Sequence, residues 1–160
     1  MTNFGSELLA AALAGTAADE DPVRHVAELP ARRGRPCAWP DWAPAEVVHA
    51  FTERGIDAPW SHQVEAADLA RRGRHVVVST GTASGKSLAY QLPILTALAT
   101  DARARALYLS PTKALGHDQL RAAHELTAAV AGLPDVAPAA YDGDSPTEPR
   151  RFARQYSRWV

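Results

Sequence analysis

The chain has 160 residues, of which 33 are alanine, so the hydrophobic fraction of 46% overstates the large side chains available to build a core. That composition suits one modest domain. The 17 basic and 18 acidic side chains give a formal net charge of −1, which excludes both a histone-like polycation and an acidic solvating tail, so any contact with nucleic acid must be local.

Residues 1–43 are expected to form an N-terminal extension, which consists of one short helix after Ser6, an acidic connector, and an irregular proline-rich segment packed by its two tryptophans. No basic residue precedes the apolar run at 8–14, so that run is not a secretion signal. No stretch reaches the roughly 18 apolar residues that cross a bilayer. The single cysteine, Cys37, cannot form an intrachain disulfide. We therefore predict a cytoplasmic protein without a membrane partner.

Regular patterns begin at residue 44, and residues 44–160 are expected to form one folded portion of a domain. Pro44 opens a predicted helix that ends at Gly55. Ser61 is the expected N-cap of a second helix, which ends near Gly73.

After this second helix, short β-branched or apolar runs alternate with amphipathic stretches. Strands are predicted at 75–79, 104–110 and 136–141, and helices at 86–99, 111–130 and 146–158. The last helix is expected to begin with a capping box of Ser145 and Glu148. Such alternation implies right-handed crossovers, a parallel sheet and the α/β class. A fourth strand would only begin at Trp159, so the sheet is expected to be incomplete.

The loop between the first strand and its helix reads TGTASGKS, from Thr80 to Ser87. A loop in that place exposes backbone N–H groups at a helix N-terminus, and these groups attract phosphate oxygens. Lys86 is expected to reach the β- and γ-phosphates of a bound nucleotide, and the Ser87 hydroxyl to bind Mg²⁺. The strict G-x-x-x-x-G-K-[ST] pattern has glycine where this chain has Thr80. The alternative is a chance Gly-Lys-Ser on a surface turn, with a solvated lysine.

Three further groups of residues accompany this loop. Gln63 precedes it, and a glutamine amide can pair with the donor and acceptor edge of adenine. The second strand leads into 110–115 (SPTKAL) and the third into 141–144 (YDGD), so both groups are expected at the sheet edge where open α/β sheets bind ligands. Lys113 is either a phosphate contact or a solvent-facing residue in a helix's first turn. A solvated face of the last helix, or alternatively a phosphate-contacting one, is predicted from its arginines, Arg150, Arg151, Arg154 and Arg158.

In this order and spacing, the motifs resemble those of the first RecA-like domain of superfamily 2 DEAD/DEAH-box helicases, over about residues 40–160. Gln63 resembles the Q motif of that family, Thr82–Ser87 motif I, and Pro111–Leu115 motif Ia. The runs WSHQ, TGTASGKSLAY, LSPTKALGHDQ and YDGDSP are most similar to the YprA/MrfA-like branch of bacterial DNA helicases.

The resemblance implies a RecA-like P-loop fold and two sets of site residues. ATP and Mg²⁺ would be bound by Gln63, Thr82, Ala83, Ser84, Gly85, Lys86 and Ser87, with Ser87 contacting the metal. Nucleic acid, DNA rather than RNA, would be contacted by Pro111, Thr112, Lys113, Asp142 and Gly143.

Two parts of such a helicase are not found in the sequence. No D-E-x-[DH] box is present, so the carboxylates that hold Mg²⁺ and orient the attacking water are lacking. A second RecA-like domain would supply an arginine finger, which is worth roughly 10³ to 10⁵ in rate. By the resemblance, residues 44–160 are truncated before that box, contain no catalytic residue and are inactive alone. Two alternatives stay open: another P-loop enzyme, such as a small-molecule kinase, and a non-catalytic nucleotide-binding module.

Overall fold

The computed structural model describes residues 4–16, 22–25, 27, 34–81 and 84–160. The chain divides into two compact units, Met1–Arg33 and Gly34–Val160. The first unit contains α1, Phe4–Leu13, which is the helix predicted for the extension. Within the described residues, no helix combines the length and the apolar character needed to cross a membrane.

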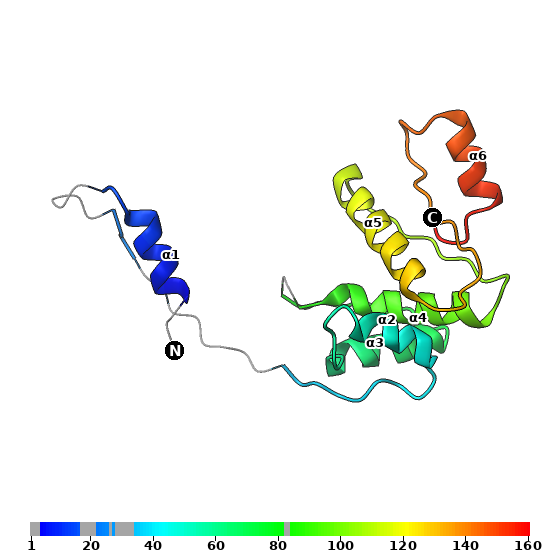
Figure 1. The fold of residues 1–160 in the computed structure, drawn as a ribbon, viewed down its shortest axis with the longest axis horizontal. Helices are drawn as coiled ribbons and strands as arrows, with labels where there is room; N and C mark the ends of the chain where they lie inside the picture. The colour runs from blue at the N-terminus through cyan, green and yellow to red at the C-terminus, as the bar shows by residue number, and fades with distance from the viewer. Residues whose placement is uncertain (1–3, 17–21, 26, 28–33, 82–83) are drawn as a thin grey trace. The chain divides into compact units, whose positions relative to one another are not determined.

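In the part of the second unit that the structure describes there are five helices (Figure 1), α2 Ala45–Thr52, α3 Ser61–Arg71, α4 Lys86–Thr100, α5 Lys113–Ala129 and α6 Thr147–Gln155. All five were predicted, and their ends differ from the prediction by a few residues. Helix α3 packs along α4, and α2 contacts both α4 and α5. The apolar sides of these helices form the core, in which Phe51, Leu92 and Leu95 are almost completely buried.

Residues 34–43 pack against α2 and α3. The Trp39 ring stacks on Phe51 with 5.7 Å between the ring centroids, and the Trp42 indole N–H donates to Asp68 Oδ1 at 2.5 Å. The two tryptophans therefore pack this irregular segment as predicted. The second compact unit begins at Gly34, before the boundary that the sequence suggested at residue 44.

The predicted start of the last helix is wrong. Pro146 is the N-cap of α6, and the Ser145 hydroxyl donates to Asp142 Oδ1 at 2.8 Å instead of capping the helix. Glu148, which was expected to complete a capping box, pairs with Arg151 at 2.7 Å. Ser145 therefore belongs to the turn that precedes the helix.

The predicted parallel sheet is not formed by the described residues. The three segments predicted as strands contain no regular strand. Among the described residues of these segments and the chain end, one isolated parallel bridge is formed, between Ala106 and Trp159. A cavity of about 1110 Å³ lies between the first and second segments and over α4. Val77 is 94% exposed. A parallel strand is held by backbone hydrogen bonds to a neighbouring strand, and among the described residues none is formed between 75–79 and another segment.

The third predicted strand is also interrupted from within. Ala137 has a φ of 46°, a left-handed conformation that is incompatible with a strand. Pro138 follows it and has no N–H to donate to a neighbouring strand. These two residues explain why the segment stays irregular.

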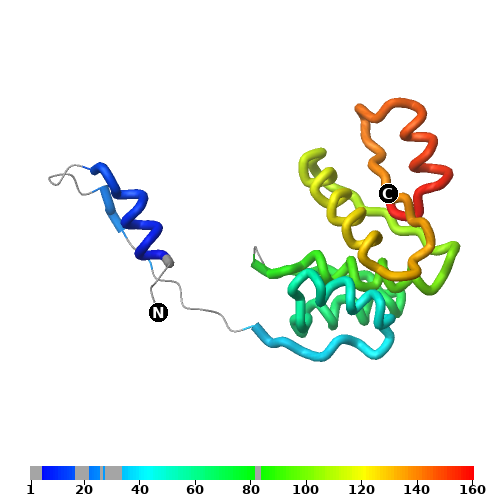
Figure 2. The backbone as a smooth tube through the Cα atoms, viewed as in Figure 1, coloured from blue at the N-terminus to red at the C-terminus, as the bar shows by residue number. Residues whose placement is uncertain are grey.

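The last residues of the chain lie between the second and third segments, whose paths Figure 2 traces. The Ala106 N–H donates to the Arg158 carbonyl at 2.7 Å, and the Val160 N–H donates back to Ala106 at 3.0 Å. On the other side, the Ala139 N–H donates to the Trp159 carbonyl at 3.0 Å. A short parallel pairing therefore begins where the sequence predicted a fourth strand.

Arg158 is buried and lies beyond the end of α6, so the prediction that it shares a solvated face with the arginines of that helix is wrong. Its Nη2 donates to the carbonyls of Leu98 and Asp101 at 3.0 and 2.5 Å, and its Nε donates to Ala104 at 3.2 Å. The last carbonyls of a helix have no partner within the helix. Arg158 satisfies carbonyls at the end of α4 and joins that end to the last segment of the chain.

Candidate functional site

The predicted phosphate loop leads directly into α4, whose N-cap is Gly85. Two of its residues, Thr82 and Ala83, lie outside the described residues. Gly85 has a φ of 68°, a left-handed conformation that residues with a side chain disfavour. A Cβ at this position would lie 2.5 Å from Gln63 Nε2. The backbone conformation and the neighbouring amide therefore both require glycine here.

Gln63 lies in the first turn of α3, where it is 4% exposed, and both ends of its amide are bonded. Oε1 accepts the Trp60 N–H at 2.7 Å, and Nε2 donates to the Gly85 carbonyl at 2.8 Å. Trp60 is thus the N-cap of α3, in place of the predicted Ser61. A glutamine amide has two N–H groups and two lone pairs, and these two bonds use one of each. Gln63 therefore fastens the phosphate loop to α3, a contact that the sequence did not predict.

His62 makes a second link between α3 and the loop. Its Nε2 lies 3.1 Å from the carbonyl oxygen of Ser84. Two consecutive residues of α3 thus hold the carbonyls of two consecutive loop residues. The WSHQ run contains His62, but the contact of His62 with Ser84 was not predicted.

Lys86 folds back over the loop. Its Nζ donates to the carbonyls of Gly81 and Thr80 at 2.6 and 3.1 Å, and to Ser84 Oγ at 3.4 Å. The Thr80 hydroxyl lies 2.6 Å from Ser84 Oγ, a contact that the glycine of the strict pattern could not make. The ammonium therefore faces loop oxygens at the N-terminus of a helix. An anionic phosphate group fits here, because the Lys86 ammonium and the backbone N–H groups at this helix N-terminus are all hydrogen-bond donors.

Ser87 is half-buried in the first turn of α4, close to Tyr90 in the next turn. Burial raises the pKa of the Tyr90 hydroxyl, and a hydrogen bond with Ser87 acts in the opposite direction. Tyr90 also donates to Gln119 Oε1 on α5. Among the described residues, no three His, Cys, Asp or Glu side chains gather as metal ligands. A Mg²⁺ ion at Ser87 would therefore depend on phosphate oxygens and water for its other ligands.

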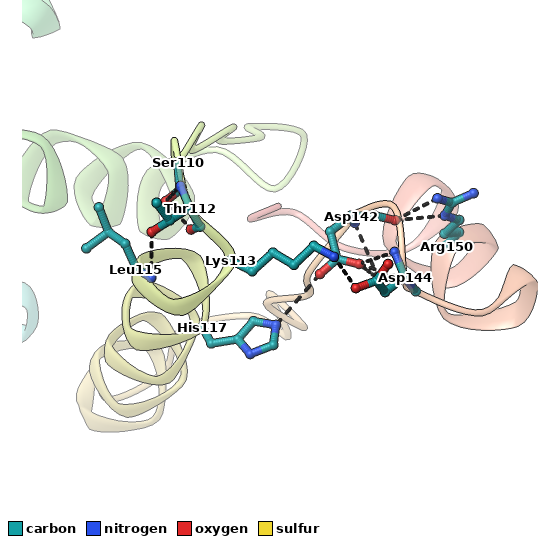
Figure 3. Close-up of polar contacts among 9 residues, drawn as sticks. Ser110, Thr112, Lys113, Leu115, His117, Asp142, Asp144 and Arg150 are labelled. Carbon is teal, nitrogen blue, oxygen red and sulfur yellow. Dashed lines mark hydrogen bonds and ion pairs between the residues drawn. The ribbon is translucent and has the colours of Figure 1, made fainter.

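The predicted nucleic-acid segment forms the start of α5 (Figure 3). The Thr112 hydroxyl caps this helix by accepting the Leu115 N–H at 3.3 Å, and Ser110 Oγ donates to the Thr112 carbonyl at 2.7 Å. Pro111, Thr112 and Lys113 are all exposed. The segment therefore presents a helix N-terminus, a hydroxyl and a cation on one exposed surface.

The turn from Asp142 to Ser145 lies opposite this helix start (Figure 3). The Asp142 carboxylate accepts hydrogen bonds from Ser145 Oγ and N, both at 2.8 Å, and from Asp144 N at 3.0 Å. These hydrogen bonds hold the pKa of Asp142 below its usual value, and the bond from the Ser145 hydroxyl has the largest effect. Arg150 of α6 donates twice to the Asp142 carbonyl, at 2.7 and 3.0 Å. Asp142 therefore shapes its own turn with its carboxylate.

Lys113 forms an ion pair with Asp144 across this surface. The hydrogen bond to Asp144 raises the pKa of Lys113. His117 Nε2, one turn along α5, lies 3.7 Å from Asp142 Oδ2. The structure thus brings the ends of the second and third predicted strands together, as the sequence suggested. Gln63 and the phosphate loop form a separate group at the start of α4.

Comparison with known proteins gives a consistent result. A sequence model of the DEAD/DEAH box helicase family matches residues 60–159. The ATP-dependent helicase hrq1 of Schizosaccharomyces pombe is 39% identical over 106 residues, which are 66% of this chain and 10% of that protein. The ATP-dependent helicase YprA of Bacillus subtilis is 37% identical over 128 residues, which are 80% of this chain and 17% of that protein.

Solved structures give the same picture. The DUF1998 helicase MrfA bound to DNA and AMPPNP aligns with a TM-score of 0.80 and 33% identity, covering 97% of this chain and 21% of that one. MrfA bound to DNA aligns with a TM-score of 0.75 and 36% identity, covering 81% of this chain and 18% of that one. The described helices therefore follow a RecA-like helicase fold, although the sheet is not formed. The chain spans about a fifth or less of the length of each of these proteins.

Proposed function

Because the chain belongs to the DEAD/DEAH box helicase family, we propose that it supplies the nucleotide-binding part of an ATP-dependent DNA helicase. Residues 44–160 are the N-terminal portion of the RecA-like ATP-binding domain in this proposal. Residues 1–43 are an extension, of which residues 34–43 pack against α2 and α3. The observation that carries it is the Lys86 ammonium held by loop oxygens at the start of α4. A cytoplasmic location is part of the proposal, since one cysteine suits a reducing compartment.

The proposed ATP site consists of Gln63, Thr82, Ala83, Ser84, Gly85, Lys86 and Ser87. Lys86 leaves the carbonyls of Thr80 and Gly81 and donates to the β- and γ-phosphates, because a charged oxygen accepts a stronger hydrogen bond than a carbonyl. The first N–H groups of α4 lack acceptors within the helix and point at the same place. Ser87 holds Mg²⁺, which neutralises charge on the phosphate oxygens. Gln63 reads adenine with its remaining N–H and lone pair.

The proposed nucleic-acid site consists of Pro111, Thr112, Lys113, Asp142 and Gly143. Thr112 and Lys113 contact the sugar-phosphate backbone, since an exposed hydroxyl and a cation at a helix N-terminus suit phosphate. Asp142 contributes by holding the turn, because its carboxylate is bonded to Ser145 and Asp144. DNA is favoured over RNA because MrfA, a structural relative, was solved bound to DNA.

Residues 44–160 by themselves are expected to bind nucleotide without hydrolysing it at a useful rate. Their sequence contains no D-E-x-[DH] box, which would hold Mg²⁺ and orient the attacking water. Helicase activity also needs a second RecA-like domain to supply an arginine finger. A small-molecule kinase or a non-catalytic module, the two alternatives, would leave the exposed segment around Lys113 without a role.

The two lysines of the chain, Lys86 and Lys113, provide matched tests of the two sites. Lys86→Ala is expected to weaken ATP binding roughly ten- to a hundredfold, because it removes charge-assisted hydrogen bonds to phosphate. Lys113→Ala is expected to leave ATP binding unchanged and to weaken binding of a labelled oligothymidine. Isothermal titration calorimetry with ATP and Mg²⁺ and fluorescence anisotropy with the oligonucleotide measure the two affinities. Equal ATP binding by the wild type and Lys86→Ala would overturn the phosphate-loop assignment.

A further inference from the structure

The cation proposed to contact nucleic acid is already paired within the chain. Lys113 Nζ donates to Asp144 Oδ2, and within the described part of the chain it donates to no other group (Figure 3). The Asp144 carboxylate likewise has Lys113 as its single partner there. Both side chains are exposed, by 54% for Lys113 and 78% for Asp144. The ion pair is therefore open to an incoming anion.

The turn that presents Asp144 is held independently of this ion pair. The Asp142 carboxylate accepts the backbone N–H groups of Asp144 and Ser145 at 3.0 and 2.8 Å. Arg150 of α6 holds the Asp142 carbonyl with two donors. Asp144 therefore keeps its position on an anchored turn, whereas Lys113 has a flexible side chain that can exchange its partner.

The position of Lys113 gives the ion pair a second role. Lys113 is the first residue of α5, so its positive charge lies at the positive end of the helix dipole. A cation is disfavoured there, and an anion is favoured. Asp144 offsets this placement by bringing a negative charge to the helix N-terminus. A nucleic-acid phosphate would do the same.

Carboxylate and phosphate oxygens are interchangeable acceptors for an ammonium group. A phosphate that reaches Lys113 therefore competes with Asp144 for the positive charge, and it does so while facing the negative charges of Asp142 and Asp144. His117 lies on the same side and reaches Asp142 rather than the ion pair. While Asp144 is in place, the negative charges of Asp142 and Asp144 offset the positive charge of Lys113. They therefore weaken the attraction between Lys113 and a polyanion such as nucleic acid.

We propose that Asp144 is an internal counter-ion that competes with nucleic-acid phosphate for Lys113 and so sets the affinity and salt dependence of this site. The inference rests on the proposed function, in which Lys113 contacts the nucleic-acid backbone. The salt concentration affects both partners in this exchange. The phosphate releases its counter-cation when it binds Lys113, whereas the released Asp144 carboxylate takes up a cation from solution. The slope of log Kd against log salt is therefore smaller than the value of about 0.7 that one phosphate contact on a single strand contributes.

Asp144→Asn tests this role on the 160-residue chain. It removes the charge and keeps the backbone N–H that bonds to Asp142. Glu148→Gln is the matched control, since it changes the net charge equally at an acid that is 72% exposed and pairs with Arg151. Fluorescence anisotropy with labelled oligothymidine is measured over a salt series. Asp144→Asn is expected to tighten binding about two- to fivefold and to steepen the salt slope by up to about 0.7, whereas Glu148→Gln leaves both near wild type.

Lys113→Ala in the wild-type and Asp144→Asn backgrounds completes a double-mutant cycle. The gain from Asp144→Asn is expected to disappear when Lys113 is absent. A gain that persists without Lys113, or one no larger than that of Glu148→Gln, would overturn the role of Asp144 while leaving the proposed site intact. If Lys113→Ala changes binding in neither background, the proposed nucleic-acid site itself is wrong. Circular dichroism of each variant verifies that the helices are retained.

Discussion

The side chain of Gln63 and the backbone of Gly85 are joined by a hydrogen bond of 2.8 Å, which runs from the first turn of α3 to the N-cap of α4. The bond occupies space that any side chain at position 85 would need, because a Cβ there would lie 2.5 Å from Gln63 Nε2. The start of α4, where phosphate is proposed to bind, is therefore positioned by α3 as well as by the loop itself.

Gly85→Ala is expected to lower the free energy of unfolding by about 1–2 kcal/mol, because alanine is strained in a left-handed conformation. The new Cβ would also push the Gln63 amide away from its carbonyl acceptor. Gly55→Ala isolates the backbone strain, since Gly55 has a φ of 81° and nothing within 4 Å of a Cβ. Gly81→Ala, in open space without a positive φ, should cost little. Urea denaturation compares the three variants, and Gly85→Ala should be the least stable.

Gln63→Ala is expected to narrow the preference for ATP over GTP, because its free N–H and lone pair are the groups proposed to read adenine. It also leaves the Gly85 carbonyl without its donor, so both nucleotides should bind more weakly. His62→Ala removes the neighbouring link to Ser84 and keeps the amide, so it should weaken both nucleotides equally. Calorimetric titration with each nucleotide gives the ratio. An unchanged ratio in Gln63→Ala would assign Gln63 to loop positioning alone.

Val77 is 94% exposed within a β-branched run, and Leu107 and Leu109 are 69% and 80% exposed. Apolar side chains beside unpaired backbone groups favour association through strand edges. The chain is therefore expected to self-associate as its concentration rises, and Val77→Lys should reduce this association. Leu8→Lys, in the separate unit that contains α1, should have no effect. Sedimentation velocity over a concentration series measures the outcome, and a wild-type chain that stays monomeric throughout would contradict the prediction.

The helices were predictable because their signals are local. Apolar spacing, Pro44 at one start and Gly55 and Gly73 after two ends define them within a few residues. The sheet was not predictable in the same way, because a parallel strand takes its hydrogen bonds from segments distant in the chain. The β-branched run at 75–79 indicates a strand, yet a strand forms only when a neighbour is present to pair with it.

The same distinction applies to the candidate sites. The motif placed Lys86 at the start of α4, since loop and helix are adjacent in the sequence. The partners of Gln63 and Lys113 could not be predicted, because they depend on how separate segments pack. The sequence of a nucleic-acid motif does not show whether its lysine faces a ligand or, as here, the carboxylate of Asp144.

The turn between Asp142 and Ser145 is expected to loosen in acid. Its hydrogen bonds lower the pKa of folded Asp142 below the ordinary carboxyl value of about 3.9. Between the two pKa values the unfolded chain therefore binds more protons than the folded chain. The stabilisation is complete above about pH 4 and is lost as the pH falls through the lower, folded value.

The ion pair between Lys113 and Asp144 sets the alkaline limit of the turn's stabilisation. Asp144 raises the pKa of Lys113, so this contribution is complete below the ordinary lysine value of about 10.4 and is lost only as the pH rises through the folded value.

The amide resonance of Ser145, which donates to Asp142, reports the acid transition in an NMR titration. Its midpoint is expected below about 3.9, and the transition should vanish in Asp142→Asn. A midpoint at or above the ordinary value would mean that these hydrogen bonds do not favour the ionised carboxylate.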